Sequence, residues 1–368
     1  MSMEIETPFE VNQEKMPTLD RYPFEDITQY YFTPVVPAYD DVSGSEWRVR
    51  QSKTENCQPL WTATIKLGNK ADGSRREIET SINEGDFGTK PEDIEAYAYA
   101  KLTKRRFSLQ DGVTVDLLAN GRMIAEKEFP SLAAKAAWVP PQWLQANYEL
   151  PSNRKLADNL KPKNYTQTPV VNDELEDVVA KLQNYCDAIV SVSGMSGSGK
   201  STAAKKIAEV MGAAYLEADH FHIGTQRLIE AYGVANHDLL EAYDYNRVGR
   251  VARGLMLGRD QRVPIYDYFS GETTGETTIK PTKKHNVVVD GLYAYRAIKD
   301  VGSHHVSLLM NTPLYVSVIR RVLRDGALQP DSRKVSFVAE ETLAYLHHYA
   351  LPSYLGVSKN SRFDFVVS

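Results

Sequence analysis

The spacing of apolar and polar residues changes along the chain, and this change predicts two domains. Up to about residue 140, short runs of alternating residues are joined by turns, and long helical patterns are few. These runs are MEIET, WRVRQ, WTATIK, RREIET, TKRRF, VTVDLL and AEKEF. Because such alternation is typical of strands with one buried face, we expect a mostly antiparallel sheet or barrel.

The second half has a different pattern. A segment from 140 to 169, rich in proline, asparagine and lysine, predicts the end of the first domain and a connector. Beyond it, the apolar runs AIVSVS, HNVVVD and HHVSLLM alternate with helical segments, among them 245–257 and 314–324. Strands separated by helices predict a parallel sheet covered on both faces. The expected domains are therefore residues 1–165, an antiparallel α+β domain, and residues 166–368, an α/β domain.

Composition narrows the classes of partner. The sequence has 43 basic and 48 acidic residues, so its net charge of -5 gives no overall field that attracts nucleic acid or an anionic membrane. No run of 18 apolar residues occurs, and neither of the two cysteines has neighbours at metal-ligand spacing. We expect a cytoplasmic protein without nucleic-acid or membrane partners, and the sequence leaves homo-oligomerisation open.

The most specific motif follows the run AIVSVS. Residues 194–202, GMSGSGKST, match GxxxxGK[ST] between an apolar strand and a helix, which is the context of a loop that binds nucleotide phosphates. Lys200 would reach the β- and γ-phosphates of ATP, and Ser201 would hold Mg²⁺. The predicted nucleotide-binding residues are Gly194, Ser196, Gly197, Ser198, Gly199, Lys200, Ser201 and Thr202.

Asp290 ends the next apolar strand and precedes a glycine. Ligands of open α/β sheets bind at the carboxyl ends of the strands, so Asp290 is a candidate to order Mg²⁺ through water. The alternative is a turn aspartate, because Asp-Gly is a common turn pair.

The order of the motifs in this domain resembles that of the uridine kinase and phosphoribulokinase family. EADHF places Asp219 where the family has the aspartate of DxFY, which implies a general base for the acceptor hydroxyl. NHDLLEAYD, residues 236–244, resembles NFDHPDAFD and implies that Asp238 lies near the sugar hydroxyls of a nucleoside. VPIYDY resembles PxYD and implies that Tyr266 and Asp267 line the acceptor pocket.

RRVLRD, residues 320–325, resembles the lid sequence of the same family. This implies that Arg320, Arg321 and Arg324 close over ATP and stabilise charge on the transferring phosphoryl group. The alternative for such a cluster is a solvated helix face.

Three departures of the sequence from the family matter for the acceptor and the metal ion. His222 stands where DxFY has its tyrosine, and Asp290 stands where the family has a glutamate. The histidine and arginine that usually follow PxYD are missing from YFSGETTG. Because these positions mostly touch the acceptor, the resemblance favours phosphoryl transfer from ATP more than it favours uridine or cytidine as acceptor. A packed structural histidine is the alternative role for His222.

In the first domain, like charges recur two residues apart along the predicted strands and therefore share a strand face. Since the intervening residues are apolar, a sheet curled around a polar interior fits better than a charged exterior. Carboxylates on one wall would hold Mg²⁺ or Mn²⁺, and the candidates are Glu4, Glu6, Glu77, Glu79, Asp116, Glu126 and Glu128. Basic side chains on the other wall would grip a polyphosphate, and the candidates are Arg48, Arg50, Lys66, Arg75, Lys104 and Arg106.

This pattern resembles the CYTH, or triphosphate tunnel metalloenzyme, family over about residues 3–160, including the segments EFPS and PPQWL. The family's ExExK motif is incomplete, because Glu4 and Glu6 match but Pro8 stands at the lysine position and supplies no cation. The glutamates can still bind metal, whereas the cation that would position a triphosphate for hydrolysis is missing at residue 8.

Three functions follow as hypotheses. The first is an ATP- and Mg²⁺-dependent kinase of a nucleoside-like hydroxyl, with a tunnel domain that hydrolyses or senses a triphosphate. The second makes the tunnel domain the sole catalyst, acting on tripolyphosphate, pyrophosphate or a nucleoside triphosphate under regulation by the P-loop domain. The third is a non-catalytic module that binds nucleotides.

Overall fold

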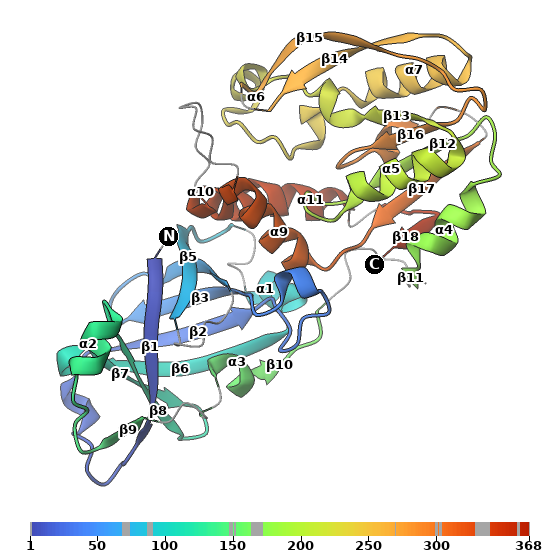
Figure 1. The fold of residues 1–368 in the computed structure, drawn as a ribbon. Helices are drawn as coiled ribbons and strands as arrows, with labels where there is room; N and C mark the ends of the chain where they lie inside the picture. The colour runs from blue at the N-terminus through green and yellow to red at the C-terminus, as the bar shows by residue number, and fades with distance from the viewer. Residues whose placement is uncertain are drawn as a thin grey trace. The chain divides into compact units, whose positions relative to one another are not determined.

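The computed structural model describes residues 2–67, 74–86, 91–146, 150, 152–162, 172–268, 270–298, 301, 304–327, 339–358 and 361–367 (Figure 1). The chain divides into two compact units. The antiparallel unit comprises Met1–Lys163 and Val338–His348, and the P-loop unit comprises Asn164–Phe337 and Tyr349–Ser368.

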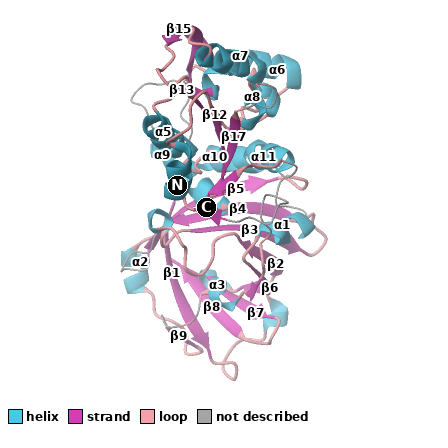
Figure 2. Cartoon of the chain, turned by 90° about the vertical axis from the view of Figure 1, so that its right-hand side faces the viewer, coloured by secondary structure: helices cyan, strands magenta, loops and turns pink. Residues whose placement is uncertain are grey.

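The antiparallel unit is built on one ten-stranded sheet, whose strands are magenta in Figure 2. Its strands are β1 (Ser2–Val11), β2 (Phe24–Tyr31), β3 (Glu46–Thr54), β4 (Leu60–Leu67), β5 (Ser74–Ile82), β6 (Ala100–Ser108), β7 (Val113–Leu118), β8 (Met123–Glu128), β9 (Leu144–Ala146) and β10 (Asp158–Asn159). Its helices are η1 (Leu19–Arg21), η2 (Asp40–Val42), α1 (Pro91–Tyr97), η3 (Gln110–Gly112), α2 (Leu132–Ala137), α3 (Asn153–Leu156) and α10 (Ala339–Tyr345).

The strand order is β10-β6-β2-β3-β4-β5-β1-β8-β7, and β6 also pairs with β7. That last pairing closes a ring of eight strands, with β9 and β10 added outside it. All of these pairings are antiparallel. The antiparallel sheet expected from the alternating runs is therefore confirmed, and its closure is compatible with a barrel.

Between β3 and β4 the register places apolar and charged residues on opposite faces. Trp47 stands opposite Ile65, while Arg48, one residue along, stands opposite Thr64. Trp47 and Ile65 are fully buried. Because side chains alternate between the two faces, the charged residues at even spacing all project from the other face. The ring thus has one apolar face and one face that carries charge.

A segment distant in sequence completes this unit. The indole Nε1 of Trp47 donates a hydrogen bond to Nε2 of His347 at 3.3 Å, and Nδ1 of His348 lies 2.6 Å from a carboxylate oxygen of Asp86. Helix α10 packs on β5. The antiparallel unit is therefore discontinuous along the chain.

The P-loop unit contains a six-stranded parallel sheet in the order β11-β18-β17-β12-β16-β13. Its strands are β11 (Asn172–Asp173), β12 (Ile189–Ser193), β13 (Ala214–Glu217), β16 (Val287–Asp290), β17 (His305–Met310) and β18 (Phe365–Val367), and a separate antiparallel hairpin is formed by β14 (Gln261–Asp267) and β15 (Glu272–Ile279). Its helices are α4 (Leu175–Leu182), α5 (Lys200–Met211), η4 (Ala218–Phe221), α6 (Thr225–Tyr232), η5 (Leu240–Ala242), α7 (Tyr245–Met256), α8 (Tyr295–Ile298), α9 (Leu314–Ala327), the π-helix η6 (Leu346–Ala350, shared between the units) and α11 (Leu351–Ser358).

Both faces of the parallel sheet are covered. Val190 and Val192 face a core to which α4 and α5 contribute, and Ile189 and Val289, of the opposite parity, are equally buried. Helices α7 and α8 contact the sheet and each other. The prediction of a parallel sheet between helices is thus confirmed, and it leaves the carboxyl ends of the strands for the loops that carry the motifs. In the part of the chain that the structure describes, we find no helix with the length and apolarity that crossing a membrane requires.

Candidate functional site

The glycine-rich loop joins β12 to α5, as its motif requires. Gly197 and Gly199 have φ angles of +89° and +86°, a region in which a side chain is strained. A Cβ at Gly197 would lie 2.4 Å from the carbonyl oxygen of Ser317, whereas a Cβ at Gly199 would meet nothing within 4 Å. One glycine therefore lets the loop pack closely on α9, and the other lets the backbone turn into Lys200, the first residue of α5.

Two buried polar atoms at this loop have no hydrogen-bond partner among the described residues. The Oγ atom of Ser198 is one, although the side chain is only 2% exposed. The other is Oδ1 of Asp290, at the end of β16, whose Oδ2 accepts a hydrogen bond from the hydroxyl of Tyr215 at 2.8 Å. Buried polar atoms are nearly always partnered, and a bound ligand would supply the partners that these two atoms lack. The donor set fits a hydrated Mg²⁺ and a phosphate.

Asp219 lies at the start of η4, directly after β13, and β13 pairs with β16 so that Glu217 stands opposite Asp290. Burial and the nearby charge of Asp290 raise the pKa of the Asp219 carboxyl, while Lys200 and a hydrogen bond from the hydroxyl of Tyr268, at 3.2 Å, oppose the rise. Asp219, Asp290 and Lys200 therefore share one electrostatic environment. A carboxylate whose proton affinity is raised is better suited to accept a proton.

The arginines of α9 have different surroundings. Both terminal nitrogens of Arg324 lie 3.4 Å from Oγ of Ser196 in the glycine-rich loop. Arg321 instead makes a bidentate ion pair with Asp238, with the closest approach at 3.0 Å. Arg320 is half-buried. Of the arginines predicted to form the lid, the structure thus brings Arg324 to the glycine-rich loop and pairs Arg321 with a predicted acceptor residue.

The predicted acceptor residues cluster around aromatic rings. Tyr266 is largely buried, its ring centroid is 4.7 Å from that of His222, and its backbone N–H donates to Nδ1 of His220 at 3.4 Å. Asp267, half-buried, accepts a hydrogen bond from the backbone N–H of Ser270 at 3.2 Å. Burial raises the pKa of Tyr266 to about 12.

Sequence reasoning missed two tyrosines at this site. Tyr215 and Tyr268 donate hydrogen bonds to Asp290 and Asp219 respectively. Tyr215 alternates with Glu217 on the strand that leads to Asp219, and Tyr268 directly follows the PxYD segment. Their placement beside the two motifs was a usable signal, whereas their hydrogen bonds depend on the three-dimensional fold.

In the antiparallel unit, β6, β7 and β8 bring predicted residues into direct contact. Arg106 donates to both carboxylate oxygens of Asp116 at 2.7 Å and to Glu126 at 2.6 Å, and Lys104 donates to Asp116 at 2.5 Å. Burial opposes ionisation of Glu126, but Arg106, Lys104 and a hydrogen bond with Glu6 lower its pKa to about 2. This part of the charged face is a buried network of ion pairs.

The neighbouring strands β3, β4 and β5 contribute a second group. Arg48 and Lys66 lie 3.6 Å and 3.9 Å from the same carboxylate oxygen of Glu77. Glu79 is exposed and accepts a hydrogen bond from Thr64 at 3.0 Å. Burial and the charge of Arg48 lower the pKa of Arg50, whose buried Nε has no hydrogen-bond partner among the described residues. An anion bound beside Arg50 would offset the cost of burying this cation.

The remaining predicted residues of this unit are less defined. The side chains of Glu4 and Arg75 lie outside the described residues, although their backbones pair in register. Glu128 is exposed, and it pairs with Glu6, while Pro8 pairs with Glu126. Across the residues whose side chains are described, no three acidic, histidine or cysteine residues are grouped to hold a metal ion. The metal ligands of this unit stay a prediction.

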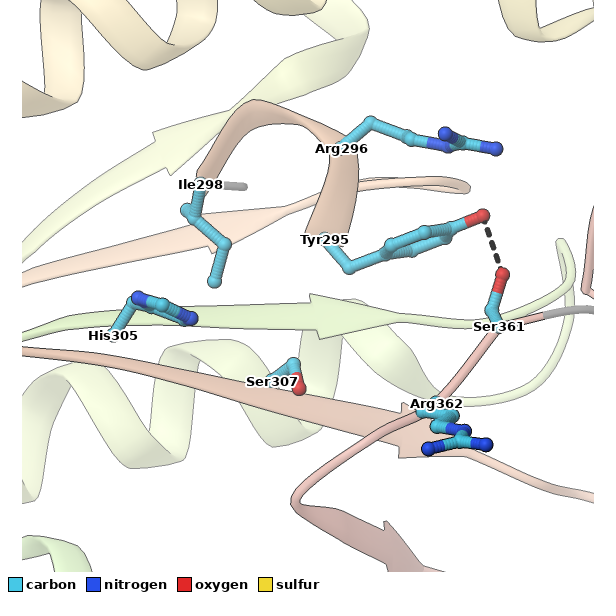
Figure 3. Close-up of a pocket in the computed structure, with 7 residues that line it drawn as sticks. All are labelled: Tyr295, Arg296, Ile298, His305, Ser307, Ser361 and Arg362. Carbon is cyan, nitrogen blue, oxygen red and sulfur yellow. Dashed lines mark hydrogen bonds between the residues drawn. The ribbon is translucent and has the colours of Figure 1, made fainter. Parts of the chain in front are cut away.

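The P-loop unit contains a cavity of about 280 Å³, whose lining residues are drawn in Figure 3. Its lining residues are Tyr295, Arg296, Ile298, His305, Ser307, Ser361 and Arg362, and Oγ of Ser361 donates to the hydroxyl of Tyr295 at 2.7 Å. None of the residues predicted to bind nucleotide or acceptor lines it.

A parallel sheet with helices on both faces, a glycine-rich loop that leads into Lys200, and carboxylates at the ends of two adjacent strands define a P-loop phosphotransferase. Comparison with known proteins specifies the class. Residues 189–334 match the model of the phosphoribulokinase/uridine kinase family. A uridine kinase of Clostridium perfringens (strain 13 / Type A) is 30% identical over 140 residues, which are 37% of this chain and 67% of that protein. The chain belongs to the phosphoribulokinase/uridine kinase family, and it is a P-loop kinase.

Other similarities are more limited. The inorganic pyrophosphatase TTM1 of Arabidopsis thaliana is 30% identical over 139 residues, which are 37% of this chain but only 20% of that protein. Among solved structures, a putative fructose transport system kinase from Silicibacter sp. TM1040 matches with a TM-score of 0.43 and 17% identity, over 53% of this chain and 97% of its own. A putative adenylyl cyclase, HpAC1 from Hippeastrum, matches with a TM-score of 0.24 and 13% identity, over 36% of this chain and 82% of its own. At these TM-scores, no argument rests on either structure.

Proposed function

We propose that the P-loop unit transfers a phosphoryl group from ATP to a hydroxyl of a nucleoside-like acceptor. The observation that supports this most is the grouping of Lys200, Asp219 and Asp290 beside a glycine-rich loop, with one oxygen of Asp290 lacking a partner among the described residues. ATP, bound with Mg²⁺, supplies the phosphoryl group. Lys200 and the loop amides would hold the phosphates, Ser201 would hold the ion, and Asp290 would order it through water.

Each protein group in this proposal has one task. Asp219 accepts the proton of the acceptor hydroxyl as that oxygen forms its bond to the γ-phosphorus and the bond to the β-phosphate oxygen breaks. Arg324, already beside the loop, and Arg320 on the same helix stabilise the charge that spreads over the transferred group. Asp238, Tyr266 and Asp267 contact the acceptor.

The antiparallel unit is, in the same proposal, a CYTH-type tunnel that binds or hydrolyses a triphosphate or polyphosphate. The closed ring of eight antiparallel strands supports it, as do basic residues on the charged face. Arg50 supports it most, because a buried guanidinium nitrogen without a partner among the described residues stabilises an anion. Glu6 and Glu126 would hold Mg²⁺ or Mn²⁺ together.

A second candidate function has the antiparallel unit as the sole catalyst, a metal-dependent tripolyphosphatase or pyrophosphatase regulated through the P-loop unit. The similarity to an inorganic pyrophosphatase and the charged face favour it. The two candidates differ in which unit turns over substrate, and substitutions within one unit separate them.

One experiment tests both. Purified protein is incubated with ATP, Mg²⁺ and a panel of nucleosides and other hydroxyl metabolites, with products identified by mass, and phosphate release from tripolyphosphate and pyrophosphate is followed without acceptor. The kinase proposal predicts an ATP-dependent product that Lys200→Ala abolishes and that Lys206→Ala, a change on the same helix at an exposed ion pair, leaves intact.

The second candidate predicts phosphate release that survives Lys200→Ala but is lost in the joint variant Glu77→Gln, Glu79→Gln. The matched control is the joint variant Glu55→Gln, Glu84→Gln, at two exposed positions of the same unit. A phosphorylated acceptor that forms equally well in Lys200→Ala would contradict the kinase proposal.

A further inference from the structure

Two histidines that lie apart in sequence contact each other through their rings. His222 follows η4, the element that carries Asp219, and His237 precedes η5. The ring centroids are 4.9 Å apart with an angle of 26° between the planes, and Nε2 of His222 lies 3.1 Å from Nδ1 of His237. His222 is 5% exposed. One ring nitrogen must therefore donate a proton to the other.

The backbone determines the direction of that hydrogen bond. The N–H of Gly224 donates to Nδ1 of His222 at 3.0 Å, so this nitrogen is an acceptor. A neutral imidazole carries one proton, and the proton of His222 must then be on Nε2, from which it is donated to Nδ1 of His237. His237 in turn must carry its proton on Nε2. A single amide thus fixes the tautomers of both rings and leaves one N–H donor at the end of the chain.

The surroundings keep both rings neutral. Burial lowers the pKa of His222 to about 4, and the neighbouring His237 adds to this effect, while Asp238 opposes it. Burial also lowers the pKa of His237. The charge of Arg321 adds to this effect, whereas the charges of Asp238 and Glu272 oppose it. Protonation of His222 would in addition place an N–H against the N–H of Gly224, which costs the hydrogen bond between them.

The donor borders the proposed acceptor pocket. The ring of Tyr266 packs on His222 at 4.7 Å and on Tyr268 at 5.3 Å, and the hydroxyl of Tyr268 donates to Asp219. On the other side, His237 directly precedes Asp238. Among the described residues, His237 makes its side-chain hydrogen bond through Nδ1. The side chain of His237 is half-exposed.

We propose that His237 determines the choice of acceptor by donating its Nε2 proton to an oxygen or an unprotonated ring nitrogen of the acceptor, and that His222 is the positioning residue that holds this donor in place. The inference rests on the proposed kinase function. His222 stands at the tyrosine of the family motif DxFY, and His237 stands at the phenylalanine of NFDHPDAFD. A hydroxyl and an apolar ring are thus replaced by a pair of imidazoles that presents one fixed N–H donor. The acceptor is therefore a molecule with a carbonyl or ring-nitrogen acceptor, in contrast to a plain polyol.

The first test is kinetic, with the full chain, ATP and Mg²⁺, and with uridine, cytidine, adenosine, guanosine, ribose and glycerol as probes. His237→Phe is expected to lower kcat/KM about tenfold or more for the nucleosides, because the acceptor atom loses its donor, while KM for ATP and any activity on ribose stay unchanged. His237→Gln keeps an N–H donor and should restore part of the loss. His304→Phe, at an exposed position, is the matched control.

The second test needs no turnover. Nitrogen NMR of the labelled imidazoles at neutral pH should show both rings as neutral Nε2–H tautomers. In His222→Phe, the ring of His237 should populate both tautomers. The His237 Nε2 resonance should shift with at least one nucleoside and not with ribose or glycerol.

Rings that are doubly protonated, an Nδ1–H tautomer, or a resonance that no probe moves would overturn the inference. So would His237→Phe with unchanged nucleoside selectivity in an active protein. A resonance that shifts with nucleosides in a protein that phosphorylates none of them would refute the kinase proposal, and with it the role of His237 in choosing an acceptor, while the hydrogen bond from His237 to the nucleoside would stand.

Discussion

Replacement of Asp219 by asparagine tests the proposed chemistry directly. Asparagine has nearly the same shape, and its amide oxygen still accepts the hydrogen bond from Tyr268, but it cannot take a proton at neutral pH. A positioned general base contributes a factor of about 10² to 10⁴, which corresponds to about 3 to 5 kcal/mol of the activation barrier. We expect kcat to fall by that factor, with the affinity for ATP unchanged because Lys200 and the loop are intact.

The pH profile gives a second readout of the same group. Burial raises the pKa of Asp219 above the ordinary aspartate pKa of 3.8. When the pH is lowered, the kcat of the wild-type protein should therefore begin to fall while the pH is still above 3.8. That acidic limb should be absent in Asp219→Asn. Tyr268→Phe removes a hydrogen bond that lowers this pKa, so the limb should move to higher pH. The assay is kcat for the best acceptor of the panel, measured between pH 4 and 8, with the exposed Asp187→Asn as control. A kcat within about threefold of wild type in Asp219→Asn would refute the role of general base.

Three further predictions concern backbone, charge and packing. Gly197→Ala places a Cβ 2.4 Å from a backbone oxygen and should weaken the binding of ATP. Gly233→Ala, at a similar φ but in open space, should cost only about 1 kcal/mol of stability and leave ATP binding unchanged. Equal ATP affinity in the two variants would contradict the packing argument. Arg106 lowers the pKa of Glu126 from 4.5 to about 2, so the stability that Glu126 contributes, up to about 3 kcal/mol, is complete above about pH 4.5 and lost as the pH falls toward 2. In urea unfolding between these pH values, the free energy of unfolding of Glu126→Gln should therefore vary less with pH than that of the wild type. The same pH dependence in both proteins would be the contrary result. Trp47→Ala removes a fully buried indole and should lower the free energy of unfolding by about 3 to 5 kcal/mol in chemical denaturation, and a cost below 1 kcal/mol would speak against its place in the core.

The sequence predicts those parts of the fold that depend on local pattern. The alternation in WTATIK and VTVDLL, read as strands with one charged face, agrees with the register that sets Arg48 opposite Thr64 and Arg106 opposite Asp116. The parallel sheet follows likewise from strands separated by helices. These features follow from side-chain alternation and periodicity, which are visible in a single segment.

Contacts between distant segments could not be predicted in this way. Nothing in LHHY, residues 346–349, indicates that His347 accepts a hydrogen bond from Trp47, 300 positions away. The motifs named Arg321 and Asp238 as separate functional residues, but only the fold shows that they pair with each other. A motif specifies a residue's chemistry, whereas its partner depends on the tertiary packing.

The same limit applies to His237. The motif that contains His237 indicates a role for the neighbouring Asp238 alone. The contact between His237 and His222 depends on the fold, which brings two separate loops together. Hydrogen-bond direction, set here by the N–H of Gly224, is a property of backbone geometry that no residue pattern carries.

In the proposed kinase, the loop from Gly194 to Thr202 holds the phosphates of ATP through its amides and Lys200. Isothermal titration calorimetry of the full chain with ATP, with and without Mg²⁺, tests it most directly. We predict saturable binding that depends on Mg²⁺ and that weakens at least about tenfold in Lys200→Ala, while Lys206→Ala binds as wild type does. The same affinity in the absence of Mg²⁺ and in Lys200→Ala, or no binding of ATP by the wild-type protein, would contradict it.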